Sequence, residues 1–200
     1  MKANGTREKI IKVALKLFSE KGYYPTTIKQ IAKESNVNEL TIFRHFGSKG
    51  NLFQLATEHS AADSKVEDIL QGINELGFSE AMLVITPRIY KLYIENTKLY
   101  KVQMKLSDDE KDFVKLKLSR KIAAVCEKYF QEQKVQDNIE GDPHIMSITL
   151  INSLLGAFTV QVLSDDTMTQ VHWQDIVTEH TVQFIAAYSK HSTQLLTKGD

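Results

Sequence analysis

The chain has 200 residues and a single cysteine, Cys126. One cysteine cannot form a disulfide within the chain, which suits a reducing compartment. Cys126 follows the apolar run of residues 122–125, where a small core residue is the simplest interpretation. No signal-peptide pattern opens the sequence, because its first residues run directly into a charged helical stretch. We therefore expect a cytoplasmic protein.

The sequence also lacks the motifs that carry catalysis or hold metals. It has no glycine-rich phosphate loop, no paired-cysteine or His-Glu-x-x-His spacing, and no nucleophile elbow. His172, Asp175 and Glu179 can share one helix face, but no fourth ligand accompanies them. A solvated polar face is the simpler interpretation, so we expect no metal, no cofactor and no enzyme activity.

Uninterrupted apolar runs and strand patterns are missing as well. The longest apolar-rich stretch, residues 145–163, is broken by Ser, Thr, Asn and Gln, and does not indicate a membrane span. Helical periodicity dominates instead, which predicts an all-α fold of about nine helices. The expected helices after the first fifty residues cover 48–59, 61–76, 79–95, 97–106, 107–133, 144–163 and 173–189.

Charge is unevenly distributed although its formal sum is zero. Residues 1–50 hold ten Lys and Arg against four Glu, a net charge of +6, so the remaining residues carry −6. A basic segment on an acidic body is typical of a protein that binds phosphate with one end. Taken alone, the charge is explained more simply by Lys–Glu pairs on a solvated helix face, but the motif in this segment reverses that preference.

Residues 26–46 have the pattern of two short helices joined by a tight turn. Ile28, Ile31 and Ala32 give the first helix one apolar face, and Thr26 or Thr27 can cap it. Residues 35–36 break the pattern. In the second helix, Ile42 and Phe46 lie four residues apart and face inward together, while the other side chains face outward. This is the helix-turn-helix arrangement, whose second helix reads the DNA major groove.

The flanking sequence supports that interpretation. An amphipathic helix is expected over residues 6–20 and ends at Gly22, and Ser48 can cap the helix that follows. In this order the sequence resembles the N-terminal domain of the TetR family of transcriptional regulators, over about fifty residues. The matching residues are Phe18, Gly22, Tyr23, Thr26, Thr27, Ile31, Ala32, Val37, Thr41, Ile42, Phe43, Phe46, Ser48 and Lys49. Two residues depart from the family pattern, because Leu40 stands where the family often has a small residue and Phe43 where it usually has tyrosine.

The resemblance implies a three-helix DNA-binding domain over residues 1–50 and a helical effector-binding and dimerisation domain over residues 51–200. It implies a homodimeric repressor that binds a near-palindromic operator and releases it when a small hydrophobic effector binds. The motif predicts that Asn38, Glu39, Leu40 and Thr41 approach base edges. The full set of predicted DNA-binding residues is Thr27, Lys29, Asn38, Glu39, Leu40, Thr41, Phe43, Arg44, His45 and Lys49.

The predicted effector site lies among the helices of the second domain. Apolar pockets between helices suit hydrophobic small molecules, although the same side chains are also ordinary candidates for a core. The residues are Met82, Ile89, Tyr93, Met104, Phe113, Leu116 and Phe158.

The predicted dimer interface is a four-helix bundle built from the last two helices of each chain. The helix over residues 144–163 is apolar around most of its circumference, more than one core covers, which is unusual on a monomer. The interface residues are Leu150, Leu154, Ala157, Val177, Phe184 and Tyr188.

An alternative function is a DNA-bound scaffold or transcriptional activator with a protein partner and no small-molecule effector. The two functions can be distinguished by experiment. A small molecule that weakens operator binding would support the repressor and not the alternative.

Overall fold

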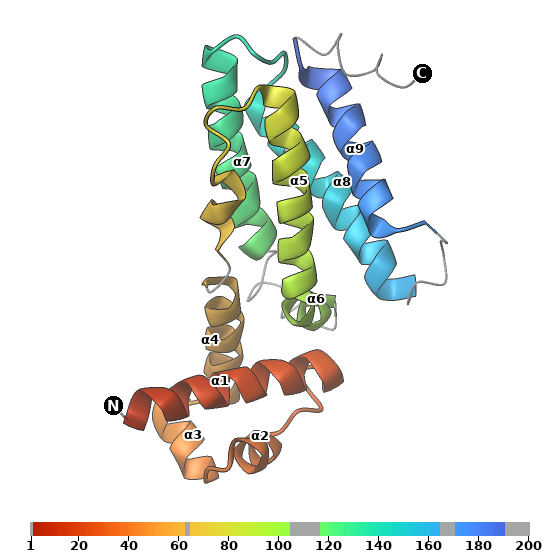
Figure 1. The fold of residues 1–200 in the computed structure, drawn as a ribbon. Helices are drawn as coiled ribbons and strands as arrows, with labels where there is room; N and C mark the ends of the chain where they lie inside the picture. The colour runs from red at the N-terminus through yellow and green to blue at the C-terminus, as the bar shows by residue number, and fades with distance from the viewer. Residues whose placement is uncertain (1, 63–64, 105–116, 165–170, 191–200) are drawn as a thin grey trace. The chain divides into compact units, whose positions relative to one another are not determined.

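The computed structural model describes residues 2–62, 65–104, 117–164 and 171–190, without the side chains of residues 2–4, 60–62 and 103. Over these ranges the chain forms nine α-helices, one short 3₁₀ helix and no strand (Figure 1). The predicted all-α fold is therefore confirmed. The chain divides into two compact units, residues 1–64 with 96–117 and residues 65–95 with 118–200.

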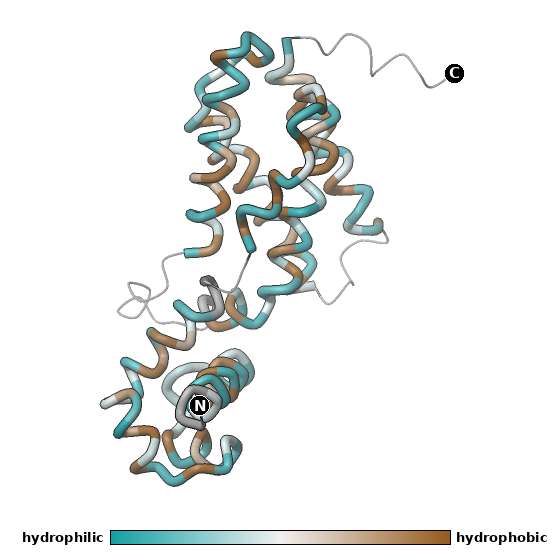
Figure 2. The backbone as a smooth tube through the Cα atoms, turned by 60° about the vertical axis from the view of Figure 1, so that its left-hand side comes forward, coloured by the Kyte–Doolittle hydropathy of each residue, from teal (hydrophilic) through white to brown (hydrophobic). Residues whose placement is uncertain are grey.

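The first unit is built around a long N-terminal helix. Its elements are α1 (Lys2–Lys21), α2 (Ile28–Ser35), α3 (Glu39–Phe46), α4 (Lys49–Ala62) and α6 (Thr97–Met104). Helix α1 packs against α2, α4 and α6, and the apolar side of each helix faces the others. Along the tube in Figure 2, apolar and polar residues alternate at short intervals, as expected for helices with one buried side. The unit extends past residue 50 because α4 and α6 pack on it.

The second unit is a bundle that buries both aromatic and aliphatic side chains. Its elements are the 3₁₀ helix η1 (Val66–Leu70), α5 (Phe78–Glu95), α7 (Lys117–Val135) from its second residue on, α8 (Pro143–Ser164) and α9 (Trp173–Tyr188). Helix α5 packs against η1, α8 and α9, and α8 packs against α9. The Phe130 ring of α7 lies 6.2 Å from Phe78 of α5 and 5.7 Å from Phe184 of α9.

A buried pair of hydroxyls joins α5 to α9. The Oγ1 atoms of Thr86 and Thr181 lie 2.6 Å apart, and each also lies within hydrogen-bond distance of a carbonyl one turn back in its own helix, that of Met82 or of Val177. Each hydroxyl has one proton, so one threonine donates across the pair and the other to its own helix. Both side chains are almost wholly buried, and the pair satisfies their polar atoms.

The helix predicted over residues 61–76 does not form, and that prediction was wrong. Helix α4 ends at Ala62, and the next described residues form η1, with Gly72 beyond it at a φ of +73°. The buried side chains of Val66 and Ile69 lie three residues apart, a spacing that a 3₁₀ turn also satisfies. Arg88 of α5 donates to the carbonyls of Ile69 (3.2 Å) and Gln71 (2.6 Å), so a side chain distant in sequence holds this turn.

The long helix predicted over residues 107–133 can be compared only in part. Residues 105–116 lie outside the described part of the chain. The helix is described from Lys117 and continues to Val135, two residues beyond the predicted end.

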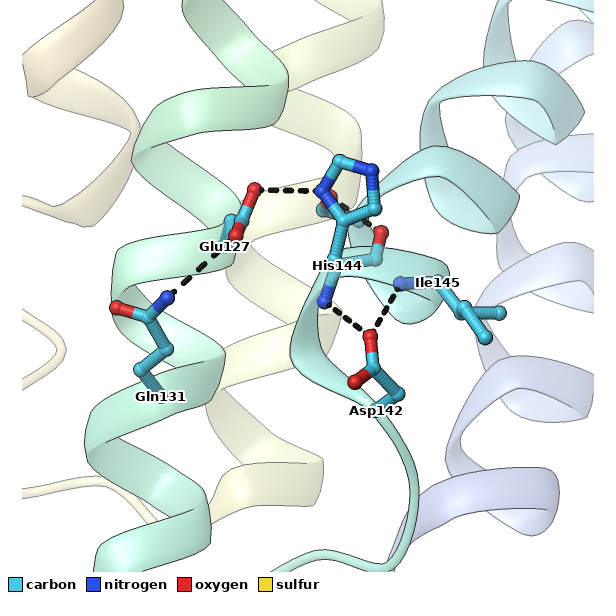
Figure 3. Close-up of polar contacts among 6 residues, drawn as sticks. Glu127, Gln131, Asp142, His144 and Ile145 are labelled. Carbon is cyan, nitrogen blue, oxygen red and sulfur yellow. Dashed lines mark hydrogen bonds and ion pairs between the residues drawn. The ribbon is translucent and has the colours of Figure 1, made fainter.

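The start of α8 carries a small polar network that reaches α7 (Figure 3). Asp142 Oδ1 accepts hydrogen bonds from the backbone N–H groups of His144 (2.9 Å) and Ile145 (3.0 Å), so it caps α8. The bond from Ile145 is the main reason that the pKa of Asp142 is lowered. His144 Nδ1 lies 3.0 Å from Glu127 Oε2 of α7, and this contact raises the pKa of His144.

The loop between α7 and α8 packs against the end of α9. Glu140 donates its backbone N–H to the Tyr188 carbonyl (2.8 Å), and Ile139 pairs with Ser189 in an isolated antiparallel bridge. Gly141 adopts a φ of +130°, and a Cβ added there would lie 2.9 Å from Cδ1 of Tyr188. Glycine is thus required both by the backbone conformation and by the approach of the Tyr188 ring.

Gly141→Ala is predicted to lower the free energy of unfolding by about 1–3 kcal/mol, because the new methyl meets the Tyr188 ring in a backbone conformation that disfavours it. Urea denaturation followed by circular dichroism measures the change. Gly5→Ala in α1 is the control, since a Cβ there has no neighbour within 4 Å and the helix gains alanine's higher propensity. Equal effects of the two substitutions would contradict the assigned contact.

Glu127→Gln is predicted to bring the pKa of His144 back toward its ordinary value of 6.5. Because Glu127 raises that pKa, the contact stabilises the fold fully below pH 6.5 and is lost as pH rises through the raised pKa. An NMR titration of the imidazole tests the shift, and Glu132→Gln on the same helix serves as the control. An identical His144 titration in wild type and Glu127→Gln would contradict the prediction.

Candidate nucleic-acid interface

The turn between α1 and α2 is fixed by a buried threonine. Helix α1 ends where Gly22, at a φ of +91°, donates its N–H to the Phe18 carbonyl (2.9 Å), which confirms Gly22 as the helix end. The Thr26 hydroxyl is fully buried and lies 2.7 Å from the Gly22 carbonyl and 3.2 Å from that of Leu17. This hydrogen bonding ties the start of α2 to the end of α1.

Both ends of α2 carry specific caps. Thr27 Oγ1 accepts the N–H of Gln30 (3.2 Å), and Gln30 Oε1 accepts the N–H of Thr27 (3.1 Å), which together form a capping box. At the other end Asn36 has a φ of +53°, and Val37 donates its N–H to the Ala32 carbonyl (3.0 Å). The tight turn predicted at residues 35–36 is therefore present, and it sets the direction in which α3 begins.

Helix α3 presents one side to the core and the rest to solvent. Asn38 Oδ1 accepts the N–H of Leu40 (2.6 Å) and caps the helix. Ile42 and Phe46 are buried, as their spacing predicted. Arg7 of α1 covers the Phe46 ring, with its guanidinium carbon 5.6 Å from the ring centre. With two anchors in eight residues, the backbone that carries the outward side chains is held in place.

Packing behind α3 is aromatic. The fully buried Phe18 ring of α1 meets the Phe53 ring of α4 edge-on at 5.0 Å, and Tyr23 lies 4.9 Å from Phe53. Edge-to-face rings add to the stabilisation that their buried area gives. Ser48 Oγ accepts the N–H of Asn51 (3.0 Å) and caps α4, again as predicted.

Lys49 is held against the α1–α2 turn. Its ammonium donates to the Tyr24 carbonyl (3.2 Å) and lies 4.3 Å from the centre of the Tyr23 ring. These contacts fix the position of the charge, which the sequence did not reveal because the partners lie 25 residues away. Tyr24 itself is 67% exposed beside Lys49, and sequence reasoning gave it no role.

The structure brings the predicted DNA-binding residues to the outer side of the same three-helix arrangement. Leu40 is 71% exposed and Phe43 is 46% exposed, values that are high for such large apolar side chains. The exposed set also contains Thr27, Lys29, Asn38, Glu39 and Arg44, and the half-exposed set contains Thr41, His45 and Lys49.

Comparison with known proteins agrees with this geometry. A family model described as "Bacterial regulatory proteins, tetR family" matches residues 10–56, the segment from α1 into α4. The segment from α1 into α4 therefore matches the TetR family, as the sequence predicted. The solved structure of a putative TetR-family transcriptional regulator from Mesorhizobium loti has a TM-score of 0.80 at 19% identity, over 94% of this chain and 99% of that one. The fold of the family thus extends over both units.

Curated relatives match the N-terminal part. HbdR, an HTH-type transcriptional regulator of Aromatoleum sp. (strain CIB), is 43% identical over 70 residues, which are 35% of this chain and 30% of that protein. IcaR of Staphylococcus aureus (strain Newman), a negative transcriptional regulator of the biofilm operon icaADBC, is 44% identical over 48 residues, 24% of this chain and 26% of IcaR. The chain therefore spans less than a third of either relative.

The predicted effector residues that the structure describes fall in both units. Met82, Ile89, Tyr93 and Phe158 are buried in the second unit, where Tyr93 and Phe158 stack at 5.6 Å. Tyr93 donates to Ser119 Oγ (3.1 Å), and burial raises its pKa to about 12. Met104 is exposed in α6 of the first unit, and Phe113 and Leu116 lie outside the described residues.

Four of the six predicted interface residues face the chain's own core instead. Leu150, Leu154, Val177 and Phe184 are buried within one chain, so a partner cannot cover them, and this part of the prediction is corrected. Ala157 and Tyr188 are half-buried.

By length and composition α8 could cross a membrane, but its inner side packs on α5 and α9. Its exposed apolar residues are Ile145, Ile148, Val160 and Leu163.

Metal chemistry finds no support in the described part of the chain, where no group of three His, Cys, Asp or Glu residues could hold an ion. Cys126 is buried, and burial raises the pKa of its thiol to about 12, so it is not a reactive thiolate.

Ser35→Ala is predicted to raise the free energy of unfolding by up to about 1 kcal/mol, because the Ser35 hydroxyl is buried without a hydrogen-bond partner. Thr26→Val also removes a buried hydroxyl, but here we expect the free energy of unfolding to fall. It keeps the side-chain shape but removes a buried hydroxyl that donates to a carbonyl, and we expect a loss of about 1–2 kcal/mol. Thermal and urea unfolding measure both. Destabilisation by Ser35→Ala would show that its hydroxyl has a partner after all.

Proposed function

We propose that this protein is a cytoplasmic transcriptional repressor that binds operator DNA through α3 and releases it when a small hydrophobic molecule binds the second unit. The observation that carries the proposal is the geometry of α3, which buries Ile42 and Phe46 and exposes its other large side chains. The family match covers this same segment. Repression is supported by the similarity of the N-terminal segment to IcaR, a negative transcriptional regulator.

The exposed side chains around α3 have separate roles in this proposal. Asn38, Glu39, Leu40 and Thr41 lie at its N-terminal end, the part of a recognition helix that meets base edges. Arg44 lies one turn later and can reach a base or a phosphate. The capping oxygen of Thr27 leaves its hydroxyl proton to donate to a phosphate, and Lys29, His45 and Lys49 add positive or proton-donating groups.

Dimerisation is proposed through the exposed side of α8. Ile145 and Leu163, near the two ends of this helix, are 60% and 64% exposed. With Ile148 and Val160 they form an apolar row, interrupted by the exposed Thr149 and Asn152, that a second copy of the helix would cover. A two-fold dimer presents two copies of α3, which explains a near-palindromic operator.

Effector binding is proposed at the stacked aromatic side chains of the second unit. Met82, Ile89, Tyr93 and Phe158 supply an apolar surface, and the Tyr93 hydroxyl bonded to Ser119 adds a polar group. A ligand there lowers DNA affinity only by its preference for the DNA-free shape of the protein. Selection of duplexes from a randomised pool, repeated with lipophilic compounds, tests both binding and release. Enrichment of no duplex would overturn the proposal.

Ile148→Lys is predicted to weaken self-association by more than about tenfold, because it places a charge in the apolar row of α8. Operator binding should weaken with it. Sedimentation at micromolar concentration measures the association, and Ala124→Lys, exposed on α7, adds the same charge elsewhere as a control. A wild-type protein that sediments as a monomer would exclude both this interface and the palindromic operator.

A further inference from the structure

Helix α3 has an outward apolar surface that its fold does not use. Leu40 is 71% exposed and Phe43, three residues later, is 46% exposed, whereas the core side of the helix is already filled by Ile42 and Phe46. A leucine side chain exposed to this extent contributes little burial free energy to the fold. A side chain of this kind on the proposed recognition helix therefore points to an apolar feature of the DNA.

The position from which the Leu40 side chain projects is set by the backbone of α3. Asn38 Oδ1 accepts the Leu40 N–H at 2.6 Å, which holds the backbone of Leu40 in the first turn. Burial of Ile42 anchors the helix next to this turn, so the Cα–Cβ bond of Leu40 points away from the core. Its branched end projects farther than the small side chain that the family often has here.

Exposed positive charges beside α3 favour DNA as the occupant of this surface. Lys29 at the start of α2 and Arg44 on α3 are both exposed, and both carry the sign that phosphates require. Contacts to phosphates hold a protein in register on the duplex but carry no sequence information. Sequence selectivity must then come from side chains such as Leu40 that reach the base edges between the phosphate rows.

The chemistry of a leucine side chain restricts which base it prefers. It has no hydrogen-bond donor or acceptor, and the C5-methyl group of thymine is the apolar feature of the major-groove edge. Against the polar edge of guanine, adenine or cytosine, leucine would displace water from donors and acceptors without replacing their hydrogen bonds. Methyl contact therefore discriminates between thymine and the other three bases.

We propose that Leu40 reads the 5-methyl group of one thymine in each operator half-site, with Phe43 continuing the apolar surface beside it. This inference rests on the proposed DNA-binding function and specifies what α3 recognises. Leu40 would then set specificity at one base pair, while Lys29 and Arg44 set affinity.

Deoxyuridine tests the inference, because it differs from thymidine only in lacking that methyl group. A duplex is first selected from a randomised pool with the wild-type protein, and each thymine in one half-site is then replaced by deoxyuridine. We expect one replacement to weaken wild-type binding about fivefold, the effect of removing one methyl contact. Dissociation constants are measured at one fixed salt concentration, because binding to DNA depends strongly on salt.

Variants assign the effect to Leu40. Leu40→Ala should bind the thymine and uracil duplexes equally, while Leu40→Met, which keeps an apolar end, should retain a preference for thymine. Lys29→Ala should weaken binding to both duplexes and leave their ratio at about fivefold, because it removes a phosphate contact only. All three changes lie at exposed positions, so they leave the fold intact.

The outcomes separate this inference from the proposed function. If the selected duplex binds equally well at every uracil position, or if Leu40→Ala keeps the wild-type ratio, the methyl contact is excluded while DNA binding stands. If no duplex is selected and no complex forms, both the function and the inference are overturned.

Discussion

Burial of the Phe18 ring between α1 and α4 is the contact on which the DNA-facing surface depends. The ring is fully buried and meets Phe53 edge-on, which fixes the two longer helices of the first unit against each other. Helices α2 and α3 have eight residues each, too few to be stable alone in water. They take their stability from this support, through the buried hydroxyl of Thr26 on one side and through Ile42 and Phe46 on the other.

Local signals explain how much of the first unit could be predicted from the sequence. The caps at Thr27, Asn38 and Ser48 each act within three residues along the chain, so the pattern of side chains contains them. Ile42 and Phe46 could be assigned to the core because four-residue spacing has one geometric meaning in a helix. The position of Lys49 could not be predicted, because the Tyr23 ring and the Tyr24 carbonyl reach it only after folding.

Periodicity failed where the sequence is apolar on every side or where distant groups decide. Helix α8 has so many apolar residues that no pattern distinguishes the side facing its own core, and Leu150 and Leu154 were assigned to the wrong side. The break after α4 was missed because the turn over residues 66–70 is stabilised by Arg88, which follows it by about twenty residues. In both cases tertiary contacts, which a local window does not contain, determine the outcome.

The hydroxyl pair of Thr86 and Thr181 limits how the second unit can change shape. Sliding α5 along α9 by one turn would separate two buried oxygens that now satisfy each other, and their burial keeps solvent from replacing either partner. Rotation or tilting of the two helices as one body keeps the pair intact. The hydroxyl pair therefore disfavours a shift of α5 against α9, and a movement of the two helices together costs less because it breaks no buried hydrogen bond.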